Sequence, residues 1–295
     1  MTHPEFGEIV RTPDAAFEAL PGYPFAPHWA EVEGLRMHFV EEGAGDRVWL
    51  CLHGQPTWSY LYRRMIPVLV EAGQRVVAPD LIGFGKSDKP MDDAVYTFDF
   101  HRWMLLGFLA ELQAKRITLV VQDWGGLLGL TLPMEDARID RLLILNTTLA
   151  TGEAPGEGFL AWRAFVAGNP DFSISRLMQR SCPHLTEAEA AAYNAPFPDA
   201  QYRAGVRRFP QLVPTTPEDA GVDVSRRAAR FLSEDWRGRS WMTYGAQDPV
   251  FGAEVMEAMA ATVRGCPPPV PRPEAGHFTQ EWGEAIAREA LVELG

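Results

Sequence analysis

The chain has 295 residues, of which 46% are hydrophobic, and a formal net charge of −12. This length can bury a large core, in one domain or in a domain with an insertion. The negative charge argues against a nucleic-acid or anionic-membrane partner, because both require a basic patch. No apolar run approaches the roughly 20 residues that span a bilayer, and we expect no signal peptide. The three distant cysteines predict neither a disulfide framework nor a zinc site. We therefore expect a cytoplasmic protein without a metal or other cofactor.

The first half of the chain alternates short apolar strands with helices. The alternation is typical of a parallel sheet that helices cover on both faces. Strands are expected at residues 36–41, 48–52, 75–79, 117–122 and 141–146, and helices at 60–72, 98–112 and 127–132.

The alternation breaks at Thr151 and resumes near Asp223. The intervening stretch is rich in proline, alanine and aromatic residues, contains helical pieces such as 186–193 and shows no clear strand. We interpret residues 151–223 as a helical cap inserted into a main domain formed by residues 1–150 and 224–295. The second half of that domain is expected to contain helices at 225–234 and 254–263, strands at 240–245 and just before Glu274, and a last helix with apolar residues at four-residue spacing.

The strand at 117–122 ends in Asp123, Trp124 and two glycines. A strand, a sharp turn and a helix form the context of the nucleophile elbow, G-x-S-x-G. Here Gln122 stands at the first glycine and Asp123 at the serine, so Asp123 is the candidate nucleophile. Taken alone, Asp123 could instead be only the N-cap of the following helix, the less favoured interpretation.

Two further residues at strand ends favour the catalytic interpretation. Asp248 follows the strand at 240–245, and His277 precedes the last helix. The order nucleophile, acid, histidine is that of the α/β-hydrolase triad. A lone histidine is more often structural, but the agreement of three residues in order and position favours a triad.

Several stretches resemble the haloalkane dehalogenases of the α/β-hydrolase fold, and more narrowly the subfamily that acts on short-chain haloalkanes. The resemblance runs through nearly the whole chain, in the stretches 11–14, 52–60 (LHGQPTWSY), 83–90 (GFGKSDKP), 121–126 (VQDWGG), 158–162 (GFLAW) and 195–199 (APFPD).

The resemblance implies a two-step hydrolysis. Asp123 would displace the halide to form an alkyl ester, which water activated by His277 would hydrolyse, with Asp248 orienting the imidazole. A carboxylate can attack saturated carbon without losing a proton. The indole N–H groups of Trp124 and Trp162 would bind the departing halide, since an indole is a donor with no competing acceptor. Without the resemblance, Trp162 is simply a core aromatic of the cap.

The resemblance also bears on the residues around the triad. The backbone N–H groups of Gln55 and Trp124 would form the oxyanion hole. Some relatives place the triad acid after the strand that precedes the cap, where this chain has Asn146, so Asp248 keeps that role. Some relatives use an asparagine at the position of Gln55 as a halide donor and others carry a glutamate there, so Gln55 leaves the local charge balance open. The family also suggests a cis bond before Pro56.

The implied partners are a small halogenated alkane, water and a halide ion, bound by a monomer or weak oligomer. Tentative pocket residues, each equally explicable as core, are Phe159, Leu127, Val250, Phe278 and Pro210. An epoxide hydrolase on the same fold remains open, because Tyr193 and Tyr202 in the cap could protonate an alkoxide. A cofactor-free oxygenase or luciferase and a non-catalytic ligand receptor remain open as well.

Overall fold

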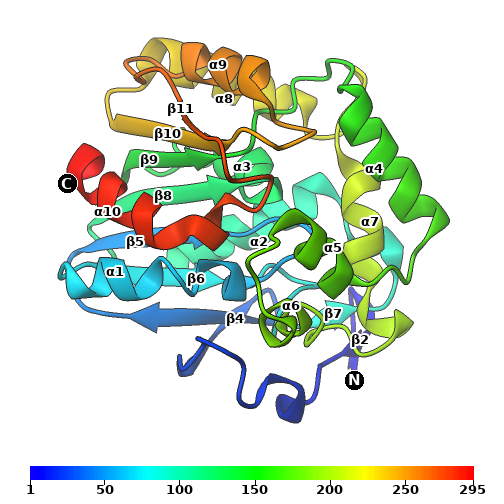
Figure 1. The fold of residues 1–295 in the computed structure, drawn as a ribbon. Coiled ribbons are helices and arrows are strands. Elements are labelled where there is room, and N and C mark those ends of the chain that lie inside the picture. The colour runs from blue at the N-terminus through cyan, green and yellow to red at the C-terminus, as the bar shows by residue number, and fades with distance from the viewer.

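The computed structural model describes residues 1–295 and is built around a sheet of eight strands in the order β11-β10-β9-β8-β5-β6-β4-β3 (Figure 1). All pairs from β6 to β11 are parallel, whereas β4 pairs with β6 and with β3 in antiparallel fashion. The predicted, mostly parallel sheet is therefore confirmed. The strands are β3 (Pro27–Val32), β4 (Leu35–Glu42), β5 (Arg47–Leu52), β6 (Arg75–Pro79), β8 (Arg116–Gln122), β9 (Ile139–Leu145), β10 (Arg239–Gly245) and β11 (Val270–Arg272).

Helices cover both faces of this sheet (Figure 1). α1 (Ile66–Glu71) and α10 (Gly283–Leu294) lie in front of it, and α2 (Phe98–Glu111) and α3 (Trp124–Gly129) lie behind it. α8 (Val222–Arg230) and α9 (Ala253–Thr262) lie near β10. Because both faces are covered, β8 is buried from Ile117 to Gln122 without polar alternation. None of the helices has both the length and the hydrophobicity needed to cross a bilayer.

Four helices follow β9 and lie beside the carboxyl ends of β8 and β9 (Figure 1). We call them the cap helices: α4 (Glu157–Gly168), α5 (Ile174–Ser181), α6 (Glu187–Ala192) and α7 (Ala204–Leu212). A capping box between Thr186 and Glu189 sets the beginning of α6. As expected from the sequence, no strand lies between β9 and β10. The carboxyl ends of β8 and β9 thus face a layer of helices.

Some predicted elements were wrong in extent. The helix expected at 60–72 is a 3₁₀ turn at Ser59–Tyr62 followed by α1. Pro67 explains the break, because proline is tolerated in the first turn of a helix but not in its interior. The helix expected at 127–132 is α3, which begins three residues earlier, directly after Asp123. The helix expected at 225–234 ends at Arg230 and continues as a π-helical turn over Phe231–Asp235.

A small sheet near the N-terminus was not predicted. It consists of β1 (Thr2–His3), β2 (Gly7–Val10) and β7 (Lys89–Pro90), all antiparallel. β3, the antiparallel edge strand, was also missed. These strands are short or exposed on one face, so each depends on partners elsewhere in the chain rather than on its own apolar pattern.

A buried ionic cluster joins the cap helices to the main sheet assembly. We call it the Arg63 cluster; its members are Arg63, Arg64, Glu281, Glu189 and Tyr193. The guanidinium of Arg63 contacts both oxygens of Glu281, at 2.6 and 2.8 Å, and the side chains are 2% and 0% exposed. Glu189 and Tyr193, from α6 and its C-cap, bind Arg64 and Glu281, respectively. The cluster fixes α6 against the 3₁₀ turn Thr279–Trp282, which follows His277.

Candidate active site

Asp123 occupies a strained turn between β8 and α3. Its backbone angles are φ 51° and ψ −127°, a region that an L-residue adopts only when its surroundings enforce it. Its side chain makes no capping hydrogen bond to α3, so the N-cap interpretation does not account for the carboxylate. Close packing requires glycine nearby: a Cβ on Gly125 would lie 2.1 Å from the carbonyl oxygen of Leu52, and one on Gly54 would lie 2.2 Å from Asp123 Oδ1.

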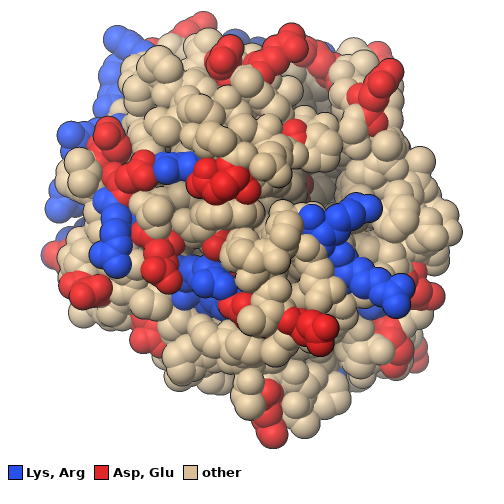
Figure 2. Space-filling view, in the orientation of Figure 1, with Lys and Arg blue, Asp and Glu red and all other residues tan.

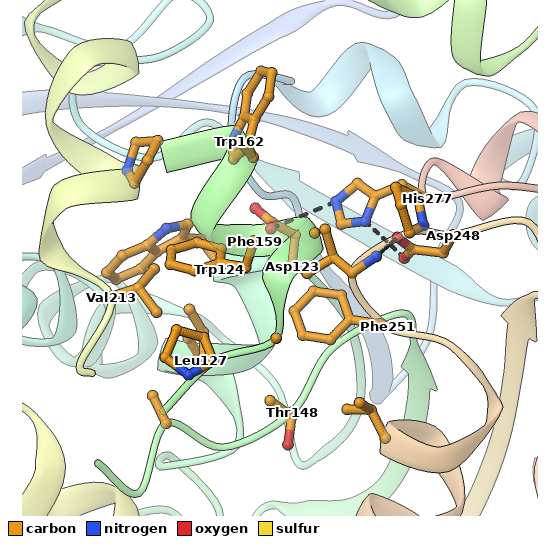
Figure 3. A pocket seen from close by; sticks show the side chains of 18 of the residues that line it. Asp123, Trp124, Leu127, Thr148, Phe159, Trp162, Val213, Asp248, Phe251 and His277 are labelled. Atoms are coloured by element: carbon orange, nitrogen blue, oxygen red, sulfur yellow. Dashed lines mark hydrogen bonds and ion pairs between the residues drawn. The ribbon is translucent and has the colours of Figure 1, made fainter. Parts of the chain in front are cut away.

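The carboxylate of Asp123 lies between a backbone donor and His277, and Figure 3 shows its contact with the imidazole. The N–H of Gln55 donates to Oδ1 at 2.7 Å, and Oδ2 lies 3.5 Å from His277 Nε2. The peptide bond between Gln55 and Pro56 is cis. No hydrogen bond joins the N–H of Trp124 to this carboxylate, so one of the two expected oxyanion donors is in contact and the other is not.

Asp248, in the loop after β10, binds the opposite side of the same imidazole. Its Oδ2 lies 2.8 Å from His277 Nδ1, and its Oδ1 accepts from the N–H of Val250 at 2.8 Å. Burial alone would raise the pKa of the Asp248 carboxyl, but the charge and hydrogen bond of His277, with further hydrogen bonds from Val250 and Asn146, lower it. The three residues that the sequence places at strand ends therefore form one chain of contacts.

The electrostatic setting of His277 favours its charged form. Burial alone would lower the pKa of the imidazole, but the charges and hydrogen bonds of Asp248 and Asp123 raise it to about 10. The imidazole is covered by the rings of Phe251 and Phe278, with centroids at 5.8 and 5.0 Å. Asp123 and Asp248 therefore both favour the charged form of the imidazole.

The two tryptophans differ in their surroundings. Trp124 is 2% exposed and packs on Phe209, with ring centroids 4.5 Å apart. Trp162, on α4, is partly buried, and its indole N–H donates to Gln55 Oε1 at 3.2 Å. The amide N–H₂ of Gln55 donates to the carbonyl oxygen of Val206 at 3.0 Å. Gln55 is thereby oriented with its oxygen toward Trp162, so it acts as an acceptor there and not as a second donor.

A cavity of about 1200 Å³ lies over these residues, and the surface is hollowed beside α4 (Figure 2). All five tentative pocket residues line it, together with the three triad residues, Gln55 and both tryptophans. It also reaches α9 at Val255 and Met259, which were not predicted. No group of three or more His, Cys, Asp or Glu side chains is arranged to hold a metal ion.

The sequence and the fold are similar to those of known proteins. Residues 48–284 match the model of the α/β-hydrolase fold family. A haloalkane dehalogenase of Mycobacterium marinum is 43% identical over 93% of this chain and 95% of its own, and one of Psychrobacter cryohalolentis is 41% identical over 95% and 96%. The chain belongs to the haloalkane dehalogenases. The structure of a tetrameric haloalkane dehalogenase from Paraglaciecola agarilytica NO2, 44% identical, matches with a TM-score of 0.94 over 97% of this chain and 98% of that one.

The cap tyrosines of this dehalogenase do not face the nucleophile. Tyr193 is buried in the Arg63 cluster, and neither Tyr193 nor Tyr202 lines the cavity. The proton donors that an epoxide hydrolase requires in its cap are therefore missing from this site, which counts against that alternative.

Asn146, at the end of the neighbouring strand β9, holds the carboxylate of Asp248 in this dehalogenase. Its Nδ2 donates to Asp248 Oδ2 at 2.8 Å, while its Oδ1 accepts from the N–H of Gly245 at 2.9 Å and from the hydroxyl of Thr279. Sequence reasoning treated Asn146 only as a residue that cannot be the acid. Its position at the end of β9, beside β10, is the signal that could have indicated this contact.

Proposed function

We propose that this dehalogenase hydrolyses small haloalkanes to an alcohol, a halide ion and a proton through an alkyl ester on Asp123. The observation that carries the proposal is the carboxylate at the elbow: it is held at 2.7 Å by the N–H of Gln55 and faces His277, which Asp248 binds from the other side at 2.8 Å.

The first step is displacement of the halide. Asp123 Oδ2 attacks the carbon that bears the halogen, and the carbon–halogen bond breaks with its electron pair on the halide. The leaving halide needs donors and no proton, and the indole N–H groups of Trp124 and Trp162 supply them. The indole N–H of Trp162 donates to Gln55 Oε1, so the halide replaces this oxygen as the acceptor.

The second step depends on the charge that the first one removes. Esterification neutralises Asp123, one of the two carboxylates that raise the pKa of His277, so the imidazole gives up its proton to solvent more readily. The neutral Nε2 then takes a proton from the water that attacks the ester carbonyl. Asp248 stabilises the imidazolium that re-forms. The Gln55 N–H, with that of Trp124 as second donor, stabilises the oxyanion on Asp123. When the oxyanion collapses, the ester C–O bond breaks and the departing alkoxide takes the proton that His277 holds; the carboxyl of Asp123 then returns its proton to His277.

The chain is divided into a main domain and an inserted cap. Residues 151–223 form a cap domain over the main domain of residues 1–150 and 224–295, and the cap contributes Trp162 to the halide site. The cavity of about 1200 Å³ exceeds the usual 300–1,000 Å³ of small-ligand sites, so chains longer than butyl should be accepted. Because a similar dehalogenase is tetrameric, we also propose that this chain self-associates, and analytical ultracentrifugation would measure its oligomeric state. A cytoplasmic location is consistent with three free cysteines.

Halide release tests the proposal directly. Purified protein should release bromide from 1,2-dibromoethane and 1-bromobutane, with one proton for each bromide, followed by a pH indicator. Diol formation from an epoxide without any bromide release would favour the epoxide hydrolase instead. Saturable binding of a haloalkane without turnover would favour a receptor, and either result would overturn the proposal.

A further inference from the structure

Gln122, the last residue of β8, stands where the elbow pattern has its first glycine. Its side chain is fully buried and touches the catalytic base. Its amide nitrogen lies 2.9 Å from His277 Nε2 and 3.1 Å from the carbonyl oxygen of His277. Gln122 Oε1 is buried without a hydrogen-bond partner. Nothing in the two-step mechanism described above uses this residue.

The carbonyl oxygen of His277 determines which end of the amide faces the imidazole. A backbone carbonyl only accepts hydrogen bonds, so the amide must present its N–H₂ group to it. Turning the amide over would place Oε1 against another oxygen. The second N–H of the same group then points at Nε2, and it can donate there only when Nε2 carries a lone pair and no proton.

We propose that Gln122 is a positioning residue that, once Asp123 is esterified, favours the neutral tautomer of His277 with its proton on Nδ1 and leaves Nε2 unprotonated, as a base requires. The inference deepens the proposed function and rests on it. Nδ1–H donates to Asp248, and Nε2 receives the N–H of Gln122 until the hydrolytic water takes its place. The bond from Gln122 to the carbonyl oxygen of His277 keeps the amide in position during this exchange.

Gln122 therefore opposes the carboxylates. Asp123 and Asp248 are the charged groups that face the imidazole and favour the imidazolium, and Phe251 and Phe278 cover the rest of the ring. A protonated Nε2 would set its N–H against the N–H of Gln122, which disfavours protonation. Once Asp123 is esterified, Asp248 alone favours the charged form, and the contribution of Gln122 weighs more.

Two substitutions separate this role from simple packing. Gln122→Met keeps the buried volume but removes the donor, so the acid limb of the kcat–pH profile should move up by as much as about one pH unit. Gln122→Glu places an acceptor at Nε2 and should move the limb further in the same direction. In Gln122→Met, hydrolysis at neutral pH should slow by roughly 3- to 10-fold. The initial burst of halide should be within about 2-fold of wild type, and mass spectrometry should show more alkyl ester.

Gln280→Met is the matched control. Gln280 is also fully buried with an unpartnered Oε1, and its amide nitrogen donates to the hydroxyl of Tyr62 at 3.4 Å. This variant should leave the acid limb and the burst unchanged. An unmoved limb in both Gln122 variants, or a limb in Gln122→Glu no higher than in Gln122→Met, would overturn the proposal.

A substrate-free measurement keeps the two proposals distinct. The pKa of His277, followed by ¹⁵N NMR in the free enzyme, should rise in Gln122→Met and rise further in Gln122→Glu. If the wild type releases no halide, the proposed function fails, but this titration still decides on Gln122. If halide is released and the titration does not move, only the role of Gln122 fails.

Discussion

The two sides of the cavity are built differently. On the sheet side, side chains of Asp123, Asp248 and His277 are fixed by bonds of 2.7–2.8 Å from backbone and neighbouring side chains. On the cap side, Trp162 makes one neutral hydrogen bond of 3.2 Å and stacks on Phe165, which is 45% exposed.

This difference indicates that the sheet side carries out the bond making and breaking, whereas the cap side determines which substrates bind. Bond making and breaking requires geometry held within fractions of an ångström, and the ends of a parallel sheet supply it. Binding a halide or an alkyl chain tolerates looser contacts, which a layer of helices provides. Changes on the sheet side should therefore cost orders of magnitude more than changes on the cap side.

The largest effect is expected for Asp123→Ala. Without a nucleophile no ester can form, so turnover should fall by roughly 10⁴-fold or more. Bromide release from 1-bromobutane measures the loss, and circular dichroism checks that the variant is folded. A folded variant that retains a tenth of wild-type turnover would show that the chemistry does not pass through this carboxylate.

His277→Phe should separate the two steps. The ester should form but persist, because no base activates water, and steady-state turnover should fall by roughly 10³-fold or more. Intact-protein mass spectrometry should show the alkyl group, and halide should appear as one equivalent per enzyme. Absence of both the adduct and the burst would place His277 in the first step instead.

The tryptophans test the comparison between the two sides. Trp124→Phe should raise KM for 1-bromobutane by roughly 10²-fold, because a buried donor to the leaving halide is lost. Trp162→Phe should raise it only about 10-fold, since its N–H already has an acceptor in Gln55 Oε1 and gains less from halide. Trp103→Phe, at a position that is 38% exposed and outside the cavity, is the control. Equal effects of the two cavity variants would contradict the comparison.

The smallest effect concerns pH. In the free enzyme the carboxylates of Asp248 and Asp123 raise the pKa of His277 to about 10. Esterified Asp123 carries no charge, so in the intermediate the pKa falls and the base becomes available at lower pH. The acid limb of kcat should accordingly lie below the pKa that NMR gives for His277 in the free enzyme. Coincidence of the two values would mean that the charge on Asp123 has no influence on the base.

The sequence predicted the parts of the fold that depend on local pattern. The sequence alone shows the chain order of the triad residues and the apolar runs that form β5, β6, β8, β9 and β10. The strands β1, β2, β3 and β7 are not, because each is short or half exposed and is held by a distant partner.

The same limit applies to the site. The strand-end positions of Asp123, Asp248 and His277 indicated that they would meet, and the structure brings them together. The contacts of Asn146 with Asp248 and of Gln122 with His277 depend on side-chain orientation across neighbouring strands. No sequence pattern records that orientation.

Because of the Arg63 cluster, α6 is attached by several hydrogen bonds to charged groups, whereas α4 is attached to Gln55 by one neutral hydrogen bond. Lifting α6 would remove Glu189 from Arg63 and Arg64, and the hydroxyl of Tyr193 from Glu281; hydrogen bonds to charged groups contribute about 1.5–3 kcal/mol each. Lifting α4 would break the neutral bond between Trp162 and Gln55, at a cost of about 1 kcal/mol. We therefore expect the cap to open at α4 while α6 stays in place, so that substrate enters and halide leaves beside α4.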